Sequence, residues 1–203
     1  MKELDRPVSI QTYKVLRNKL NLLYPAVIHH TPLTAQKAMN KAIVDAVNKQ
    51  LHDQGYGQNP MTDVTAFYEL KNNQRSVLSL SLINYAFSGG AHGMTLQKSL
   101  TFNTETGKSY TLAEQFKPGS DYIGRISAIV AEEIKRRDIT LLVDFKTIRP
   151  DQDYYIADKS IVIYFQLYEI AAYVYGFLYF PISAYALQDI VAEDSPLGLM
   201  LMG

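Results

Sequence analysis

Apolar residues recur at helical spacing in two long stretches of the chain. The first stretch predicts a helix over residues 35–52, with Thr34 as its N-cap and Gly55 as its stop signal. The second predicts a long helix that begins after Ser120 or Asp121. The expected buried stripe of this second helix comprises Ile123, Ile126, Ile129, Val130 and Ile134.

Alternating apolar and polar residues predict strands in most of the remaining chain. Residues 8–28 fit an extended segment, although 13–23 would also fit a helix, and Pro25 and Pro32 bracket a loop with His29 and His30. The other expected elements are strands over 64–70, 78–82 and 94–102, turns over 71–74 and 103–108, a helical turn over 111–116, a hairpin of 154–157 with 161–167 around Asp158–Lys159, and a short helix within 181–191.

This element order does not alternate strand and helix, and the hairpins are adjacent along the chain. An α+β fold is therefore predicted, in which antiparallel sheet hairpins pack with two long helices.

Composition excludes several classes of protein. Lys+Arg and Asp+Glu are 20 each, and a neutral chain argues against nucleic-acid binding, which usually needs a basic face. The chain has no cysteine, so a thiolate metal site and a cysteine nucleophile are excluded. No segment is apolar for about 18 residues, and residues 1–7 show no signal peptide, so no membrane span is expected.

The segment from Ser88 to Gly93 concentrates chemistry-bearing residues between two predicted strands. It holds Gly89, Gly90 and His92, so it is either a turn that needs glycine geometry or a surface that a ligand approaches closely. Its residues favour the turn.

A second unusual run, residues 164–176, is rich in tyrosine, which is abundant in this chain with 15 residues. It contains Tyr168, Glu169, Tyr173 and Tyr175. A carboxylate among aromatic rings needs a partner and often has a shifted pKa, although a structural role at the end of a strand is favoured for Glu169.

Catalytic and metal motifs are weak in this sequence. Ser88 and His92 with the remote acid Glu169 would form a hydrolase triad, but a hydrogen-bonded hairpin histidine is the favoured interpretation. His29 and His30 are adjacent and would point to opposite sides of an extended segment, so no metal site and no cofactor are expected.

An ordered set of motifs resembles a known family. The runs 85–93, 102–108, 112–116 and 164–176 are similar to the domain family DUF3298, although Ala172 stands where the family usually has proline. The upstream part resembles its companion, DUF4163. The resemblance implies a DUF4163-like region over residues 8–83 and a DUF3298-like region over 84–191, packed closely as one unit.

The resemblance also implies an extracellular or cell-surface module of Gram-positive-type bacteria. Such modules occur in an anti-sigma factor that senses lysozyme and beside the catalytic domain of a peptidoglycan deacetylase. Because this sequence shows no transmembrane helix, sigma-binding segment or deacetylase domain, signalling and deacetylation are not transferred to it.

We therefore expect a binding or sensing domain of the bacterial cell envelope whose partner is a lysozyme-type protein or peptidoglycan. The alternatives are a cell-wall hydrolase and a purely structural accessory module. The expected binding residues are Ser88, Gly89, Gly90, His92, Tyr168, Glu169, Tyr173 and Tyr175.

Overall fold

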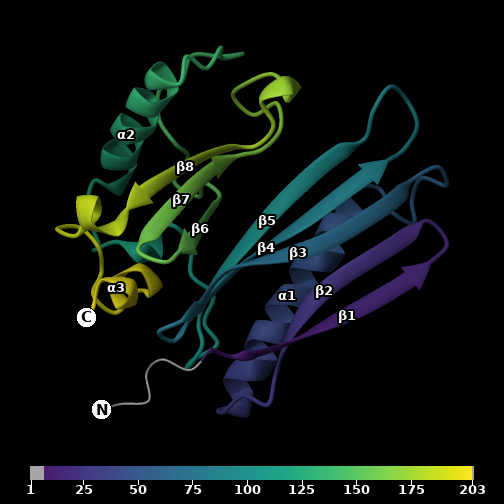
Figure 1. Ribbon diagram of the computed structural model, residues 1–203, viewed down its shortest axis with the longest axis horizontal. Coiled ribbons are helices and arrows are strands. Elements are labelled where there is room, and N and C mark those ends of the chain that lie inside the picture. The colour runs from purple at the N-terminus through teal and green to yellow at the C-terminus, as the bar shows by residue number, and fades with distance from the viewer. Residues whose placement is uncertain (1–6, 203) are drawn as a thin grey trace. The chain divides into compact units, whose positions relative to one another are not determined.

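The computed structural model describes residues 7–202 and divides into two compact units, with the boundary between Ser109 and Tyr110 (Figure 1). The two regions that the family resemblance implies, 8–83 and 84–191, stay a prediction, and residues 83 and 84 both lie within one strand (Val77–Phe87). Residues 1–6 and Gly203 lie outside the described residues. The expectation about a signal peptide concerned residues 1–7 and so falls mostly on this part. Each unit is described by itself.

Unit 1 is a five-stranded sheet with one long helix. The strand order is β1-β2-β3-β4-β5, and every neighbouring pair is antiparallel except β2 and β3, which run parallel because the helix connects them. The elements are β1 (Ser9–Arg17), β2 (Leu20–Ile28), α1 (Leu33–Asp53), β3 (Asp63–Gln74), β4 (Val77–Phe87) and β5 (Met94–Asn103).

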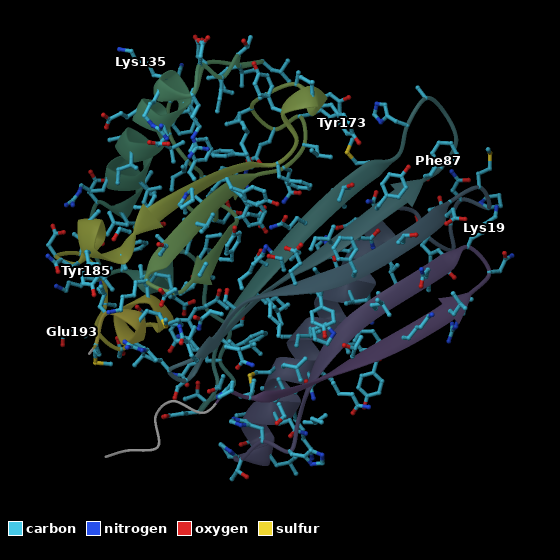
Figure 2. The ribbon with its side chains drawn as sticks, in the orientation of Figure 1. Lys19, Phe87, Lys135, Tyr173, Tyr185 and Glu193 are labelled. Carbon is cyan, nitrogen blue, oxygen red and sulfur yellow. The ribbon has the colours of Figure 1, made fainter. Side chains whose placement is uncertain are left out.

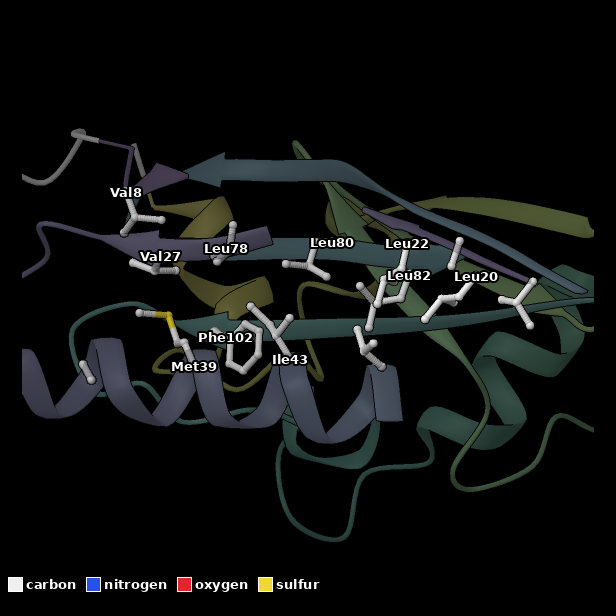
Figure 3. Packing of buried hydrophobic residues seen from close by; sticks show 14 of the residues in the cluster. Val8, Leu20, Leu22, Val27, Met39, Ile43, Leu78, Leu80, Leu82 and Phe102 are labelled. Carbon is white, nitrogen blue, oxygen red and sulfur yellow. The ribbon is translucent and has the colours of Figure 1, made fainter. Parts of the chain in front are cut away.

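The core of unit 1 lies between α1 and one face of this sheet (Figure 3). Met39 and Ile43 of α1 are fully buried there, together with Leu78 and Leu80 of β4 and Phe102 of β5. Met39 and Ile43 are four residues apart on the helix, and Leu78 and Leu80 are two residues apart on the strand. These spacings place each pair on one face of its element. The helix expected over 35–52 is confirmed.

Two asparagine side chains bond to backbone groups that have no partner strand beside them. Strand β2 pairs with β3 only from Leu20 to Leu22. Farther along β2, Asn40 on α1 accepts from the Val27 N–H at 2.7 Å and donates to the Val27 carbonyl at 2.9 Å. Asn73 on β3 does the same for Val8, with both distances 2.9 Å. Buried peptide groups need hydrogen-bond partners, and the two asparagine side chains provide them for Val27 and Val8.

Unit 2 is a three-stranded antiparallel sheet of order β6-β7-β8, with helices around it. Asp121 caps the long helix α2 by accepting from the Gly124 N–H at 2.9 Å, as expected. Of the predicted stripe, Ile126, Val130 and Ile134 are buried, whereas Ile123 and Ile129 are half-buried. The elements are the 3-10 turn η1 (Ala113–Gln115), α2 (Tyr122–Arg136), β6 (Tyr154–Ala157), β7 (Ser160–Phe165), η2 (Tyr173–Tyr175), β8 (Leu178–Ser183), η3 (Ala184–Leu187) and α3 (Pro196–Leu201).

Several local predictions for unit 1 were wrong. Pro25 lies inside β2 opposite Thr12, where β2 has no partner on its other side and a missing N–H is tolerated. The helical alternative for 13–23 is replaced by the β1–β2 hairpin. Helix α1 begins after Pro32 rather than Thr34. Strand β3 continues through 71–74.

The turn after β3 lies at Arg75 and Ser76, both with positive φ. In unit 2, the helix expected within 181–191 was also wrong in part, because Pro181 belongs to β8 and only a 3-10 turn follows.

The two hydrogen bonds between Asn40 and Val27, here called the Asn40 clamp, predict that loss of this side chain lowers local stability. Replacing Asn40 by alanine leaves the buried Val27 N–H and carbonyl without these partners, at a cost of about 1–3 kcal/mol. Native-state hydrogen exchange at the Val27 amide measures that cost directly. The neighbouring Lys41→Ala removes only an exposed pair with Asp45 and should change the same value by less than about 0.5 kcal/mol. Equal effects of both substitutions would refute the clamp.

The end of α2 predicts an acid-sensitive contribution to stability. Hydrogen bonds from Arg136, and secondarily from Arg137, lower the pKa of Glu133 from 4.5 to about 2. Because the folded-state pKa is depressed, this contribution is fully present above pH 4.5 and is lost as the pH falls toward 2. The melting temperature of Glu133→Gln should therefore approach that of the unchanged protein across this range. A constant difference between the two would contradict the pairing.

Candidate functional site

The glycine-rich segment forms the connection between β4 and β5 in unit 1. Gly89 and Gly90 have φ of +92° and +104°, a region that other residues rarely adopt. The Ser88 hydroxyl lies 2.8 Å from that of Thr62. Space beside Gly90 is open, because no atom would lie within 4 Å of a Cβ placed there. This segment is an irregular connection that bends at its glycines, with open space beside Gly90.

Gly93 is glycine for a different reason. A Cβ at this position would lie 2.5 Å from the Ala86 carbonyl oxygen and from the Tyr85 ring. His92 places its Nδ1 2.8 Å from the Gly93 carbonyl oxygen. Contacts within the protein therefore account for Gly93. The Met61 side chain would lie 3.0 Å from a Cβ added to Gly89, so of these glycines Gly90 is the one with open space beside it.

The connection between β7 and β8 in unit 2 is braced by Glu169. One carboxylate oxygen accepts from the Gln166 backbone N–H at 2.7 Å, and the other accepts from the side chains of Arg149 and Gln152. Gln152 also donates to the Tyr164 carbonyl at 2.8 Å. The side chain of Glu169 is only 19% exposed, so its charge is paired and hydrogen-bonded as burial requires. Glu169 holds the connection in shape.

The tyrosines of this connection lie on its outer surface. The rings of Tyr168 and Tyr173 approach with centroids 5.6 Å apart, and Figure 2 labels Tyr173 at the tip. The Tyr175 hydroxyl accepts from the Thr140 N–H at 3.0 Å, and hydrogen bonding from Thr140 lowers the pKa of Tyr175. Tyr168, Tyr173 and Tyr175 are all exposed. Tyr168 and Tyr173 thus form an exposed aromatic pair, and a hydrogen bond holds the hydroxyl of Tyr175.

Three exposed apolar residues were not predicted from the sequence: one lies within this connection and two lie in a segment that is hydrogen-bonded to it. Val174, between two tyrosines, is 86% exposed, and Leu142 and Val143 are 55% and 59% exposed. The segment containing Leu142 is joined to the tyrosine connection, since the Leu142 N–H donates to the Ile170 carbonyl at 2.9 Å. The signal was present as an apolar triplet, residues 141–143, that fits no predicted helix or strand.

The predicted site residues therefore fall into two groups. Ser88, Gly89, Gly90 and His92 belong to unit 1, whereas the tyrosines and Glu169 belong to unit 2. Each group is local to one loop.

The hydrogen-bond partners of Ser88 and Glu169 indicate a structural role for both side chains. The Ser88 hydroxyl bonds to Thr62, and both oxygens of Glu169 bond to unit 2 residues. Within residues 7–202, no cluster of three histidine or acidic side chains could hold a metal ion. Over the same residues, every helix is too short or too polar to cross a membrane.

The brace predicts a specific effect of a charge-neutral substitution. Glu169→Gln removes the charge that pairs with Arg149 and weakens acceptance from the Gln166 N–H, so that amide should exchange faster. Asp151→Asn is the matched control, because Asp151 also pairs with Arg149 but is highly exposed. Hydrogen exchange at Gln166 that responds equally to both variants would rule out the brace.

Comparison with known proteins gives matches in both units. Residues 115–185 match the family model described as a protein of unknown function, DUF3298, and residues 3–95 match the model described as deacetylase PdaC. Each match falls within one of the two units, either side of the boundary at Ser109. The resemblance to DUF4163 stays a prediction.

The proteins that are similar to the chain include a curated relative and solved structures. The peptidoglycan-N-acetylmuramic acid deacetylase PdaC of Bacillus subtilis is 25% identical over 134 residues, which cover 63% of this chain and 29% of the relative. The chain thus spans less than a third of that protein.

A DUF3298 family protein of Pseudomonas aeruginosa has a TM-score of 0.66 at 16% identity and covers 93% of this chain and 96% of its own. A second, from Bacteroides fragilis, has a TM-score of 0.69 at 11% identity and covers 95% and 97%. These likenesses confirm the α+β fold. The second unit is therefore similar to the DUF3298 family, and the first to the family of the deacetylase PdaC.

Proposed function

We propose that this chain is a non-catalytic accessory domain of the cell wall that binds peptidoglycan. The observation that carries the proposal is the tyrosine surface of unit 2, whose rings are exposed while Glu169 and Thr140 hold the backbone and a hydroxyl in place. A preformed surface loses little conformational freedom when it binds. The similarity to PdaC, which by its name acts on peptidoglycan, supports this class of ligand.

Tyrosine suits a glycan ligand for a physical reason. A tyrosine ring offers a flat apolar face and a polar edge, and one face of a sugar ring is lined by C–H groups while its rim carries hydroxyls. Tyr168 and Tyr173, inclined by 36° to each other, present two such faces close together. The arrangement favours a chain of sugars over a small charged ligand.

The glycine turn of unit 1 is a second contact in this proposal. Open space beside Gly90 lets a ligand reach the backbone N–H and carbonyl groups there. Replacing Gly89 and Gly90 should weaken binding, whereas unfolding of that variant would assign both glycines to structure alone.

A lysozyme-type protein is the second candidate ligand. Tyr173 and Tyr175 are exposed, and tyrosines are among the residues that most often anchor protein partners. A hydrolase with Ser88, His92 and Glu169 is the rival class, and loss of cell-wall hydrolysis on alanine substitution of these residues would support it. A structural module would bind neither ligand.

The proposed location is the cell surface, where peptidoglycan lies. This is consistent with the similarity to a peptidoglycan deacetylase. The restriction to Gram-positive-type bacteria stays a prediction.

Co-sedimentation with purified peptidoglycan sacculi tests the proposal, with calorimetric titration of muropeptides and of lysozyme in parallel. We expect sedimentation of the chain and heat of binding with muropeptides. Tyr173→Ala should weaken binding roughly three- to tenfold, the worth of one aromatic contact. Binding to lysozyme without binding to sacculi would transfer the function to the second candidate, and binding to neither would refute both.

A further inference from the structure

Strand β1 is an open edge of the unit 1 sheet. Within residues 7–202 it pairs with β2 alone, and Figure 1 shows it at the outer side of the sheet. Every residue of β1 is exposed except Ile10 and Val15, which are half-buried. An uncovered edge strand presents backbone N–H and C=O groups with which another extended chain can pair.

The position of Pro25 shows which backbone groups of β1 point outward. In an antiparallel pair, residues alternately direct both backbone groups toward the partner strand or away from it. Pro25 stands opposite Thr12 and has no N–H, so the groups of Thr12 point away from β2. By the same alternation, those of Lys14 and Leu16 also point outward. The backbone of Val27 agrees with this pattern, because both its groups bond to a side chain of α1 rather than to β1.

The hairpin of β1 and β2 is a cationic part of a neutral chain. Residues 9–28 carry Lys14, Arg17 and Lys19 and no acidic residue. Within the part of the chain that the structure describes, no carboxylate pairs with Lys14 or Arg17. Like charges that meet across two strands are destabilising, so these cations disfavour pairing of β1 with the β1 of a second copy. They favour a strand that carries carboxylates.

Apolar side chains accompany the cations along this edge. Tyr13 is 42% exposed and stacks on Tyr24 of β2, with ring centroids 5.6 Å apart. Leu16 is 68% exposed. Successive side chains of a strand point to opposite faces, so an aromatic ring and an aliphatic chain are available on the two faces. A strand laid beside β1 would gain cross-strand contacts with both, in addition to its backbone hydrogen bonds.

We propose that β1 binds an acidic, extended peptide segment of a protein partner, which adds to the sheet as a further strand. Backbone hydrogen bonds to Thr12, Lys14 and Leu16 supply affinity in this mode of binding, and side chains supply specificity. Lys14 and Arg17 are three residues apart and therefore lie on opposite faces. The segment thus needs two carboxylates at the same spacing. This inference does not depend on the proposed binding of peptidoglycan.

Hydrogen exchange during titration with a synthetic peptide tests the inference. The probe alternates valine and threonine except at two glutamates that are three residues apart. In the free protein, the amides of Tyr13 and Val15 should exchange slowly, because they point toward β2. Those of Thr12, Lys14 and Leu16 should exchange fast and become protected when the probe binds. Absence of this protection at saturating probe would overturn the inference.

Two altered probes separate strand addition from simple attraction of charges. N-methylation of every second residue removes the hydrogen bonds to β1 in one of the two possible alternating sets, so one set should abolish binding while the charges stay the same. A probe with its glutamates two residues apart puts both carboxylates on one face and should bind about three- to tenfold more weakly. If every altered probe binds as the original does, the contact is not a strand pairing and the inference fails.

A charge reversal with a matched control assigns the contact to β1. Lys14→Glu should raise the Kd of the probe about three- to tenfold. Lys37→Glu makes the same charge change at an exposed position of α1 and should leave the Kd within about twofold. Circular dichroism verifies that both variants fold. Equal effects of the two variants would contradict the assignment.

Two further outcomes have distinct meanings. If the outward amides of β1 are protected without the probe and the protein forms dimers in analytical ultracentrifugation, the edge pairs with a second copy and the inference is overturned. Lys14→Glu should sediment with sacculi as the unchanged protein does. Failure of the probe to bind therefore leaves the proposed peptidoglycan binding intact, and failure to sediment leaves this inference intact.

Discussion

The carboxylate of Glu169 is the interaction on which the proposed site depends. It bonds to a backbone N–H three residues earlier, to Gln152 and to Arg149, and thereby ties the β7–β8 connection to the segment that precedes β6. This tie holds the backbone that carries the exposed tyrosines. The half-buried carboxylate, which at first suggests catalysis, therefore has a structural role.

In unit 1, neutral asparagine side chains bond to backbone groups in the same way as Glu169 does in unit 2. Strand β2 pairs with β3 only as far as Leu22, and Asn40 bonds the backbone of Val27 farther along β2, while Asn73 bonds that of Val8 before β1. Both units therefore use a few side chains to satisfy backbone that the regular ladders leave unpaired. The two matched families differ, yet each unit keeps its irregular segments ordered in the same physical way.

The sequence predicted the elements whose pattern is strong. Helix α1 followed from four-residue spacing, and β4 and β5 followed from alternation, because burial of one face dictates both patterns. Strand β8 was missed because Pro181 interrupts its pattern, although proline is tolerated at a sheet edge. The end of β3 was misplaced because polar residues continue the strand at a bulge between Leu70 and Asn72.

The tyrosines of the candidate site could be predicted from the sequence, but the residues that join them from other parts of the chain could not. Tyr168, Tyr173 and Tyr175 stood out by composition, whereas Leu142 lies far away in sequence. Its segment joins theirs through tertiary contacts, which include its hydrogen bond to Ile170 and the bridge between Leu141 and Ala171. Likewise, no pattern could show that Arg149 would pair with Glu169, since 20 residues separate them.

The most direct test of the account is a map of backbone amide chemical shifts during titration with N-acetylglucosamine tetrasaccharide. The account predicts changes concentrated at residues 140–143 and 168–176. Changes confined to other parts of the chain, or no changes at saturating tetrasaccharide, would contradict it.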